Sequence, residues 1–147
     1  MSSLLPARAG GEASAATASP HMDPRRALGD AGEAEAVAHL ERRGHTILDR
    51  NFRTRYGELD VASSTGTCLV FCEVKTRTAG GRSGPALALD AVGPAKRRRL
   101  RLMAREWFRV RGPGHERLPR GVRFDAIGVV LDARRQLVAL DHVEDAF

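Results

Sequence analysis

Three residues in the middle of the sequence have the types and the spacing of a metal-assisted hydrolytic site. Asp60 closes the segment Gly57-Glu58-Leu59-Asp60, and Glu73 and Lys75 are separated by one residue. Lysine is rare here, because 22 of the 24 basic residues are arginine and only Lys75 and Lys96 are lysine. An ammonium is a compact charge whose pKa is readily shifted, unlike that of a guanidinium. Lys75 is therefore a candidate for chemistry, with compositional bias as the alternative explanation.

A predicted β-hairpin brings these residues together. Residues 56–63 and 68–76 have the pattern of two strands, and Gly66 supplies the positive φ of a type II′ turn between them. Side chains along a strand alternate between the two faces of a sheet. If the turn has an even number of residues, counting back from it places two cross-strand pairs, each with at least one acid, on the same face. A shift of one residue would reverse the faces. The expected cross-strand pairs on this face are Asp60 with Glu73 and Glu58 with Lys75.

Facing carboxylates repel each other unless a cation lies between them. Oxygen ligands at this spacing suit a hard divalent ion, Mg²⁺ or Mn²⁺. Such an ion can activate a bound water toward a phosphodiester and neutralise the developing charge. Lys75 can then hold the attacking water or stabilise negative charge on the phosphoryl group. The alternative without chemistry is a salt-bridge ladder in which Glu58 pairs with Lys75 and Asp60 pairs with an arginine.

A fourth candidate lies on the first predicted helix. Residues 24–43 have a helical pattern, and Gly44 is a favourable residue just past its end. Glu33 shares a face with Val37 and Leu40, so its carboxylate is expected to point toward the interior or a cleft. An inward carboxylate is costly unless it is paired or binds a cation. Glu33 is therefore predicted to join the site, with a solvated surface position as the alternative.

The remaining pattern predicts an α/β domain. The second helix begins at Pro94 and presents an apolar stripe that includes Leu100, Ala104 and Trp107, so it is expected to pack on a sheet. Residues 77–84 contain three glycines and predict a flexible loop. The other predicted elements are a strand at 45–52, the second helix at 94–110, and strands at 121–131 and 137–141.

The chain has the length of a single domain. Its 147 residues are 42% hydrophobic, which is enough for one core. Residues 23–147 are predicted to form this domain, and the Ala/Ser/Gly-rich residues 1–22 a disordered tail with Met22 as an alternative start. Apolar runs are shorter than the ~20 residues of a membrane span. Cys68 and Cys72 lie roughly 13 Å apart on one predicted strand, too far for a disulfide, which favours a reducing cytoplasm.

Positive charge is concentrated around the second predicted helix. Residues 94–123 carry eleven basic and two acidic residues, a net charge of +9, whereas the whole chain has +6. Such a segment is typical of a surface that binds a polyanion, most often nucleic acid. A well-solvated helix surface is the alternative.

Several short motifs occur in a fixed order along the chain. They are Gly29-Asp30-Ala31-Gly32-Glu33, Asn51-Phe52-Arg53, Gly57-Glu58-Leu59-Asp60, the run from Leu69 to Arg77, Lys96, Arg123-Phe124-Asp125 and the closing run from His142 to Phe147. This ordered set, over about residues 25–147, resembles the bacterial YraN family. That family is uncharacterised, has a restriction-endonuclease-like fold and is similar in its core to archaeal Holliday junction resolvases.

The resemblance implies an α/β fold with a restriction-endonuclease-like PD-(D/E)xK core, in which a mixed β-sheet is flanked by helices. Asp60 and Glu73 match the metal-binding acids, and Lys75 matches the catalytic lysine. Glu33 matches the first-helix glutamate of the resolvases and is expected to serve both the metal and the reaction. The implied cofactor is Mg²⁺ or Mn²⁺. Gly-Glu-Leu-Asp stands in place of the literal Pro-Asp, as is usual in this family.

Nucleic-acid contacts are expected from basic residues near this site. Lys96 and Arg123 match recurring family positions, and Lys96 is interpreted as a phosphate contact, with plain surface charge as the alternative. Asn51 and Arg53 are candidates to line the edge of the site, although strand-end capping is the favoured interpretation of Asn51, and Asp125 is interpreted as the partner of an arginine. The full set of predicted nucleic-acid-binding residues is Arg53, Lys96, Arg97, Arg98, Arg101 and Arg123.

The sequence therefore predicts a metal-dependent endonuclease that hydrolyses DNA phosphodiesters in the cytoplasm, with branched or Holliday-junction-like DNA as a candidate substrate. A homodimer is expected by analogy with the resolvases, because two opposed strands must be cut. One alternative is a non-catalytic nucleic-acid-binding module on the same fold. Another is a protein-interaction role in which the arginines bind an acidic partner.

Overall fold

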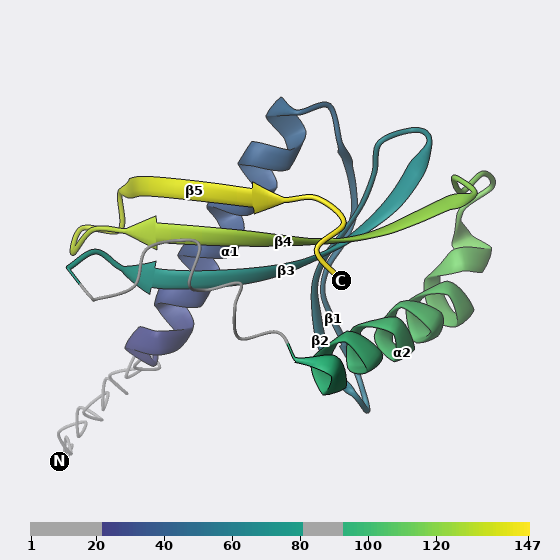
Figure 1. Cartoon of the computed structure of the whole chain (residues 1–147), viewed down its shortest axis with the longest axis horizontal. Coiled ribbons are helices and arrows are strands. Elements are labelled where there is room, and N and C mark those ends of the chain that lie inside the picture. Colours follow the sequence, from purple (N-terminus) through teal and green to yellow (C-terminus); the bar gives the residue numbers. More distant parts are fainter. Residues whose placement is uncertain (1–21, 81–92) are drawn as a thin grey trace, which may run out of the picture.

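The computed structural model describes residues 22–80 and 93–147, where one five-stranded mixed sheet is flanked by two helices (Figure 1). The strand order is β1-β2-β3-β4-β5, with β3 and β4 parallel and the other neighbours antiparallel. This architecture confirms the predicted α/β class and mixed sheet. The elements are α1 (Pro24–Arg42), β1 (Thr46–Thr54), β2 (Gly57–Ser64), β3 (Cys68–Thr78), α2 (Pro94–Arg111), the short 3₁₀ turn η2 (Gly112–Gly114), β4 (Gly121–Leu131) and β5 (Leu137–Val143).

The predicted elements all occur, each within about two residues of its expected ends. The expected loop at 77–84 is a partial error, because β3 continues through Thr78 before a turn at 79–80. The rest of that loop and the predicted tail, apart from Met22, lie outside the described residues. Neither described helix is apolar enough over a sufficient length to cross a bilayer.

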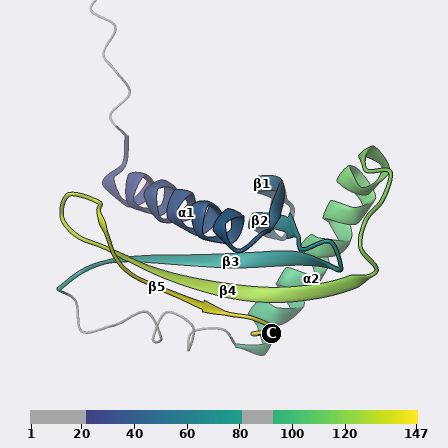
Figure 2. The ribbon, with the colours of Figure 1, turned by 90° about the horizontal axis from the view of Figure 1, so that it is seen from above.

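Two separate hydrophobic cores form on the two faces of the sheet, one under each helix, and Figure 2 shows the two helices packed against different parts of the sheet. Because side chains alternate along a strand, neighbouring residues of β3 enter different cores. Val70 joins the core under α1, which includes Leu40, and Phe71 joins the core under α2, which includes Trp107. Leu100, Met103, Ala104 and Trp107 of α2 are all buried, which confirms its predicted apolar stripe. The two helices therefore approach the sheet from opposite sides.

The β2–β3 hairpin has the predicted register. Ser64 pairs with Leu69 and Val61 pairs with Cys72, the alignment expected from the turn at Gly66, whose φ is +93°. The ladder ends at the Val61–Cys72 pair, so β2 and β3 are no longer paired where their acidic residues begin. The paired part of the hairpin thus fixes the alignment of the Glu58–Asp60 and Glu73–Lys75 segments, although these segments themselves are not paired.

A buried polar network ties the C-terminal end of the chain to α1. Asp125 is fully buried and accepts from the Nε and Nη2 atoms of Arg123 at 2.8 and 2.9 Å, which confirms its predicted arginine partner. It also pairs with Nε2 of His142 at 2.8 Å, and Nδ1 of His142 lies 3.0 Å from Nε2 of His39. Burial alone would raise the pKa of Asp125, but the hydrogen bonds from His142 and Arg123 outweigh it and lower the pKa. The charge of Asp125 is therefore balanced by side chains of the network itself.

Close packing of α1 on β3 depends on Gly32. A Cβ atom at this position would lie 1.8 Å from the Thr76 hydroxyl oxygen and 2.5 Å from its methyl carbon. Real atoms do not approach so closely, so only glycine allows the helix backbone to reach this distance from the strand. Glu33 is the next residue, and its position over the sheet therefore depends on this contact.

Replacing Gly32 by alanine is expected to cost at least about 2 kcal/mol of the free energy of unfolding, because the added methyl group overlaps Thr76. Urea denaturation followed by circular dichroism measures this change. Gly29→Ala is the matched control, since a Cβ there meets nothing within 4 Å, and helix propensity should make it stabilising by up to about 1 kcal/mol. Similar effects of both substitutions would contradict the close approach.

Candidate functional site

The acidic motifs meet where β2 and β3 separate. Oδ2 of Asp60 accepts a hydrogen bond of 2.7 Å from the backbone N–H of Val74. In a continued ladder that N–H would donate to the carbonyl oxygen of Leu59, because hydrogen-bonded pairs alternate along an antiparallel hairpin. The carboxylate of Asp60 thus replaces a strand partner and is held next to the backbone between Glu73 and Lys75.

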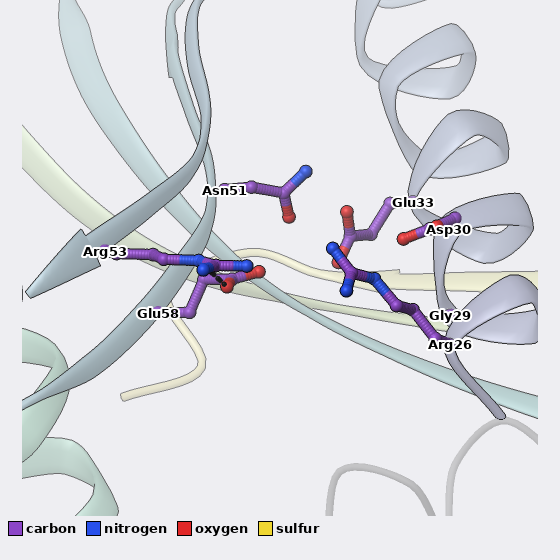
Figure 3. A pocket seen from close by; sticks show the side chains of 7 residues that line it. All are labelled: Arg26, Gly29, Asp30, Glu33, Asn51, Arg53 and Glu58. Atoms are coloured by element: carbon purple, nitrogen blue, oxygen red, sulfur yellow. Dashed lines mark hydrogen bonds and ion pairs between the residues drawn. The ribbon is translucent and has the colours of Figure 1, made fainter. Parts of the chain in front are cut away.

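Three carboxylates from two elements converge at this point. One oxygen each of Glu33 (α1), Glu58 and Asp60 (both β2) lies within 4.8 Å of the other two. Figure 3 shows Glu33 and Glu58 on opposite sides of a pocket between α1 and the strands. The pocket has a volume of about 320 Å³ and is lined by Arg26, Gly29, Asp30, Glu33, Asn51, Arg53 and Glu58.

Burial and nearby acids disfavour charge on two of these residues, Asp60 and Glu33. Burial raises the pKa of Asp60 to about 7, helped by the nearby charges of Glu73 and Glu33 and opposed by the Val74 N–H and by Lys75. Burial also raises the pKa of Glu33, against a hydrogen bond from the side chain of Asn51. A proton or a cation must therefore offset the negative charge that this cluster would otherwise carry.

A divalent cation fits this donor set. Oε2 of Glu33 is buried and has no hydrogen-bond partner among the described residues. An unsatisfied buried carboxylate oxygen costs free energy, and a cation ligated by all three acids would satisfy it. Clustered carboxylate oxygens are the ligands that Mg²⁺ and Mn²⁺ prefer.

Both lysines of the chain contact one oxygen of Glu73. Nζ of Lys75 lies 3.3 Å from Oε1 of Glu73, and Nζ of Lys96, from the first turn of α2, makes an ion pair with the same atom. The Glu73 side chain is only 10% exposed. Burial opposes charge on Lys75, but the charge of Glu73 and hydrogen bonding outweigh it and raise the Lys75 pKa. Lys75 is therefore an ammonium throughout the neutral pH range.

The structure groups Glu33 and Asp60 with Glu58, whereas Glu73, a predicted metal ligand, lies outside that group and is paired with Lys75 and Lys96. Glu33 comes from α1, Asp60 from β2, and the Glu73–Lys75 pair from β3. The alternative salt-bridge ladder is wrong in its pairing, because Glu58 bonds to Arg53 at 3.2 Å and Lys75 bonds to Glu73.

The predicted nucleic-acid-binding residues have different surroundings. Arg53 lies at the rim of the pocket, paired with Glu58. Arg123 is only 20% exposed and is held by Asp125 and Glu144 in the buried network. The role of all six in binding stays a prediction. Those on the solvent-exposed side of α2 are Arg97, Arg98 and Arg101.

Three features of the site were not predicted. Glu58 was placed on the correct face but not among the metal ligands, although its spacing of two from Asp60 carried that signal. Lys96 was expected to contact phosphate, and no sequence signal linked it to Glu73. Asn51 was expected chiefly to cap a strand end, with the edge of the site as the less favoured interpretation, but it lies within β1 at φ +51° and lines the pocket with Glu33.

Comparison with known proteins identifies the family. The family model described as "Uncharacterised protein family UPF0102" matches residues 32–129. The chain belongs to this family, which is the YraN family. The matched region of UPF0102 spans every carboxylate and both lysines of the site.

Individual UPF0102 proteins align over most of the chain. A UPF0102 protein of Anaeromyxobacter dehalogenans is 47% identical over 107 residues, which cover 73% of this chain and 75% of that protein. A UPF0102 protein of Rhodococcus jostii is 44% identical over 82% of this chain and 96% of its own length. A UPF0102 protein of Streptomyces griseus is 44% identical over 77% of this chain and 90% of its own length.

The raised pKa of Asp60 makes the stability of the metal-free protein depend on pH. Because the folded-state pKa of about 7 lies above the ordinary 3.8, the folded chain holds this proton more tightly than the unfolded chain. Stability is therefore lost as the pH rises from 3.8 toward 7. Asp60→Asn keeps an acceptor for the Val74 N–H and removes the charge. We expect it to stabilise the protein by at least about 1 kcal/mol at pH 8, with little gain near pH 4.

Urea denaturation in EDTA at several pH values measures this difference. Glu41→Gln is the control, because Glu41 is an exposed acid of the same domain outside the site. A gain for Asp60→Asn that does not change with pH would rule out the proposed environment of Asp60.

Proposed function

We propose that this protein is a divalent-metal-dependent phosphodiesterase that acts on nucleic acid, with DNA as the first substrate to test. The observation that carries this proposal is the convergence of Glu33, Glu58 and Asp60 beside the Glu73–Lys75 pair. A partly buried carboxylate cluster next to a charged lysine is an arrangement suited to phosphoryl transfer to water. The mixed sheet flanked by helices is compatible with the restriction-endonuclease-like core that we infer for it.

Four carboxylates would hold the metal or lie against it. Glu33, Glu58 and Asp60 are positioned to share one Mg²⁺ or Mn²⁺ ion, and Glu73 lies beside Asp60. A bound ion would lower the pKa of a water ligand and neutralise charge that develops on the phosphate. Asp60 must be ionised to serve as a ligand, so metal binding at this residue competes with its protonation.

Lys75 supplies a fixed positive charge beside this cluster. Its pKa is raised, so it is suited to hydrogen-bonding an attacking water or to stabilising negative charge on a phosphoryl oxygen, and not to removing a proton. Its amine is held by Oε1 of Glu73 at 3.3 Å, which limits its positions. A guanidinium in this place would crowd the carboxylates and could engage two of their oxygens at once.

The exposed arginines of α2 support nucleic acid as the substrate class. Arg97, Arg98 and Arg101 lie on the solvent-exposed side of the helix whose first turn delivers Lys96 to the site. Phosphate backbones bind such surfaces with little dependence on sequence and with strong dependence on salt. The same surface supports the second candidate, a nucleic-acid-binding module without catalysis. A homodimer, proposed by analogy with the resolvases, would place two sites against opposed strands.

Metal binding separates these two candidates. Isothermal titration with Mn²⁺ at pH 7 is expected to give a saturable site in the wild type and at least about a tenfold loss of affinity in Asp60→Asn or Glu58→Gln. Titrations in buffers of different ionisation enthalpy should show proton release, because Asp60 is partly protonated at this pH. The control is Asp132→Asn, an acid in the turn between β4 and β5. Wild-type protein without Mn²⁺ uptake would exclude the metal-dependent enzyme.

Lys75→Arg gives the most specific test of catalysis. It preserves the charge and replaces the ammonium by a larger, planar guanidinium. We therefore expect cleavage of linear, nicked, flapped and four-way DNA in Mn²⁺ to fall by at least about 100-fold. Gel assays of DNA cleavage measure this loss, and Arg77→Lys on the same strand is the matched control. Equal cutting by the wild type, Lys75→Arg and Asp60→Asn would point to a contaminating nuclease.

A further inference from the structure

The contact between Lys96 and Glu73 is not explained by a phosphate-binding role alone. Lys96 is the third residue of α2, and none of the residues in that first turn is acidic. A cation at this end of a helix is disfavoured by the helix dipole, whose positive end lies there. The ion pair with Glu73 provides the compensating negative charge.

The neighbouring arginines provide a contrast. Arg97, Arg98 and Arg99 follow Lys96 in the same turn and are exposed, whereas the Lys96 side chain is only 27% exposed and reaches a carboxylate that is 10% exposed. Glu73 Oε1 thus has two ammonium partners, one from β3 and one from the first turn of α2. Lys96 belongs to the inside of the site, unlike the arginines that follow it.

We propose that Lys96 is a positioning residue that occupies Glu73 in the metal-free protein and becomes available to a phosphate of the nucleic acid when Glu73 turns to a divalent cation. This inference rests on the proposed function. An oxygen that accepts from two ammonium groups has little capacity left for a cation, so the Lys96 contact opposes metal binding at Glu73. A phosphate that binds Lys96 removes this opposition. Metal and nucleic acid should therefore strengthen each other's binding, and Lys96 should carry part of that coupling.

Mn²⁺ affinity in the absence of nucleic acid tests the first half of this inference. Lys96→Ala and Lys96→Met are expected to bind Mn²⁺ about threefold to tenfold more tightly than the wild type by isothermal titration, because Glu73 is released. Lys96→Met keeps most of the apolar stem, and thermal melts establish that both variants are folded. Arg97→Ala, the matched control, should bind Mn²⁺ as the wild type does.

Affinity for a fluorescent oligodeoxynucleotide, measured by anisotropy in EDTA and in Mn²⁺ at 4 °C, tests the second half. The integrity of the oligonucleotide is checked on gels. Lys96→Ala should bind almost as well as the wild type in EDTA, where Lys96 is engaged with Glu73, and at least about threefold more weakly in Mn²⁺. Arg97→Ala should lose affinity for the oligonucleotide equally in EDTA and in Mn²⁺. Equal losses for Lys96→Ala in the two conditions would overturn the inference.

The outcomes also separate this inference from the proposed function. If the wild type takes up Mn²⁺ and neither Lys96 variant changes the affinity, the inference fails and the proposed function stands. If no protein takes up Mn²⁺, the proposed function fails and the inference fails with it.

Discussion

The separation of β2 from β3 beyond the Val61–Cys72 pair is the constraint on which the site depends. While strands are paired, their backbone groups satisfy each other and their side chains project to one face or the other. Where the pairing ends, the N–H of Val74 needs another acceptor and finds the carboxylate of Asp60 at 2.7 Å. This hydrogen bond fixes an acid in the plane of the sheet, which a regular strand could not do. Glu33 of α1 then lies near Asp60, and Lys96 of α2 pairs with Glu73.

The two helices each contribute a residue at the point where β2 and β3 separate, from opposite sides of the sheet. α1 is held close to β3 at Gly32 and contributes Glu33, and α2 packs through a separate core and contributes Lys96. The acids are therefore positioned by two cores that do not share residues. Packing energy of this kind offsets the repulsion among carboxylates, which by itself would drive them apart. α2, which carries the exposed arginines, also contacts Glu73 through Lys96. The surface suited to polyanions and the acid of β3 therefore belong to directly contacting elements.

Much of this arrangement could be predicted from the sequence, because it depends on local periodicity. The turn at Gly66 fixed the hairpin register, and the spacing of Asp60, Glu73 and Lys75 followed from it. The inward direction of Glu33 followed from its helical spacing to Leu40. The end of the ladder could not be predicted, since a regular alternation continues through Glu58. The Lys96–Glu73 contact joins elements far apart in the chain, and no periodic signal reports such tertiary contacts.

The pKa values of Asp125, in the buried histidine network, and of Asp60, in the candidate site, are shifted in opposite directions. Around Asp125, hydrogen bonds from Arg123 and His142 outweigh burial and favour the charged carboxylate, so this network is complete with its own residues. Around Asp60, burial and neighbouring acids outweigh one N–H and one lysine, so the ionised form remains under-compensated. Such a deficit lowers the stability of the folded chain, and the cation that we propose would offset it by binding the folded state. The contrast between Asp125 and Asp60 therefore separates a cluster whose charge is balanced by its own residues from the cluster where we propose a cation site.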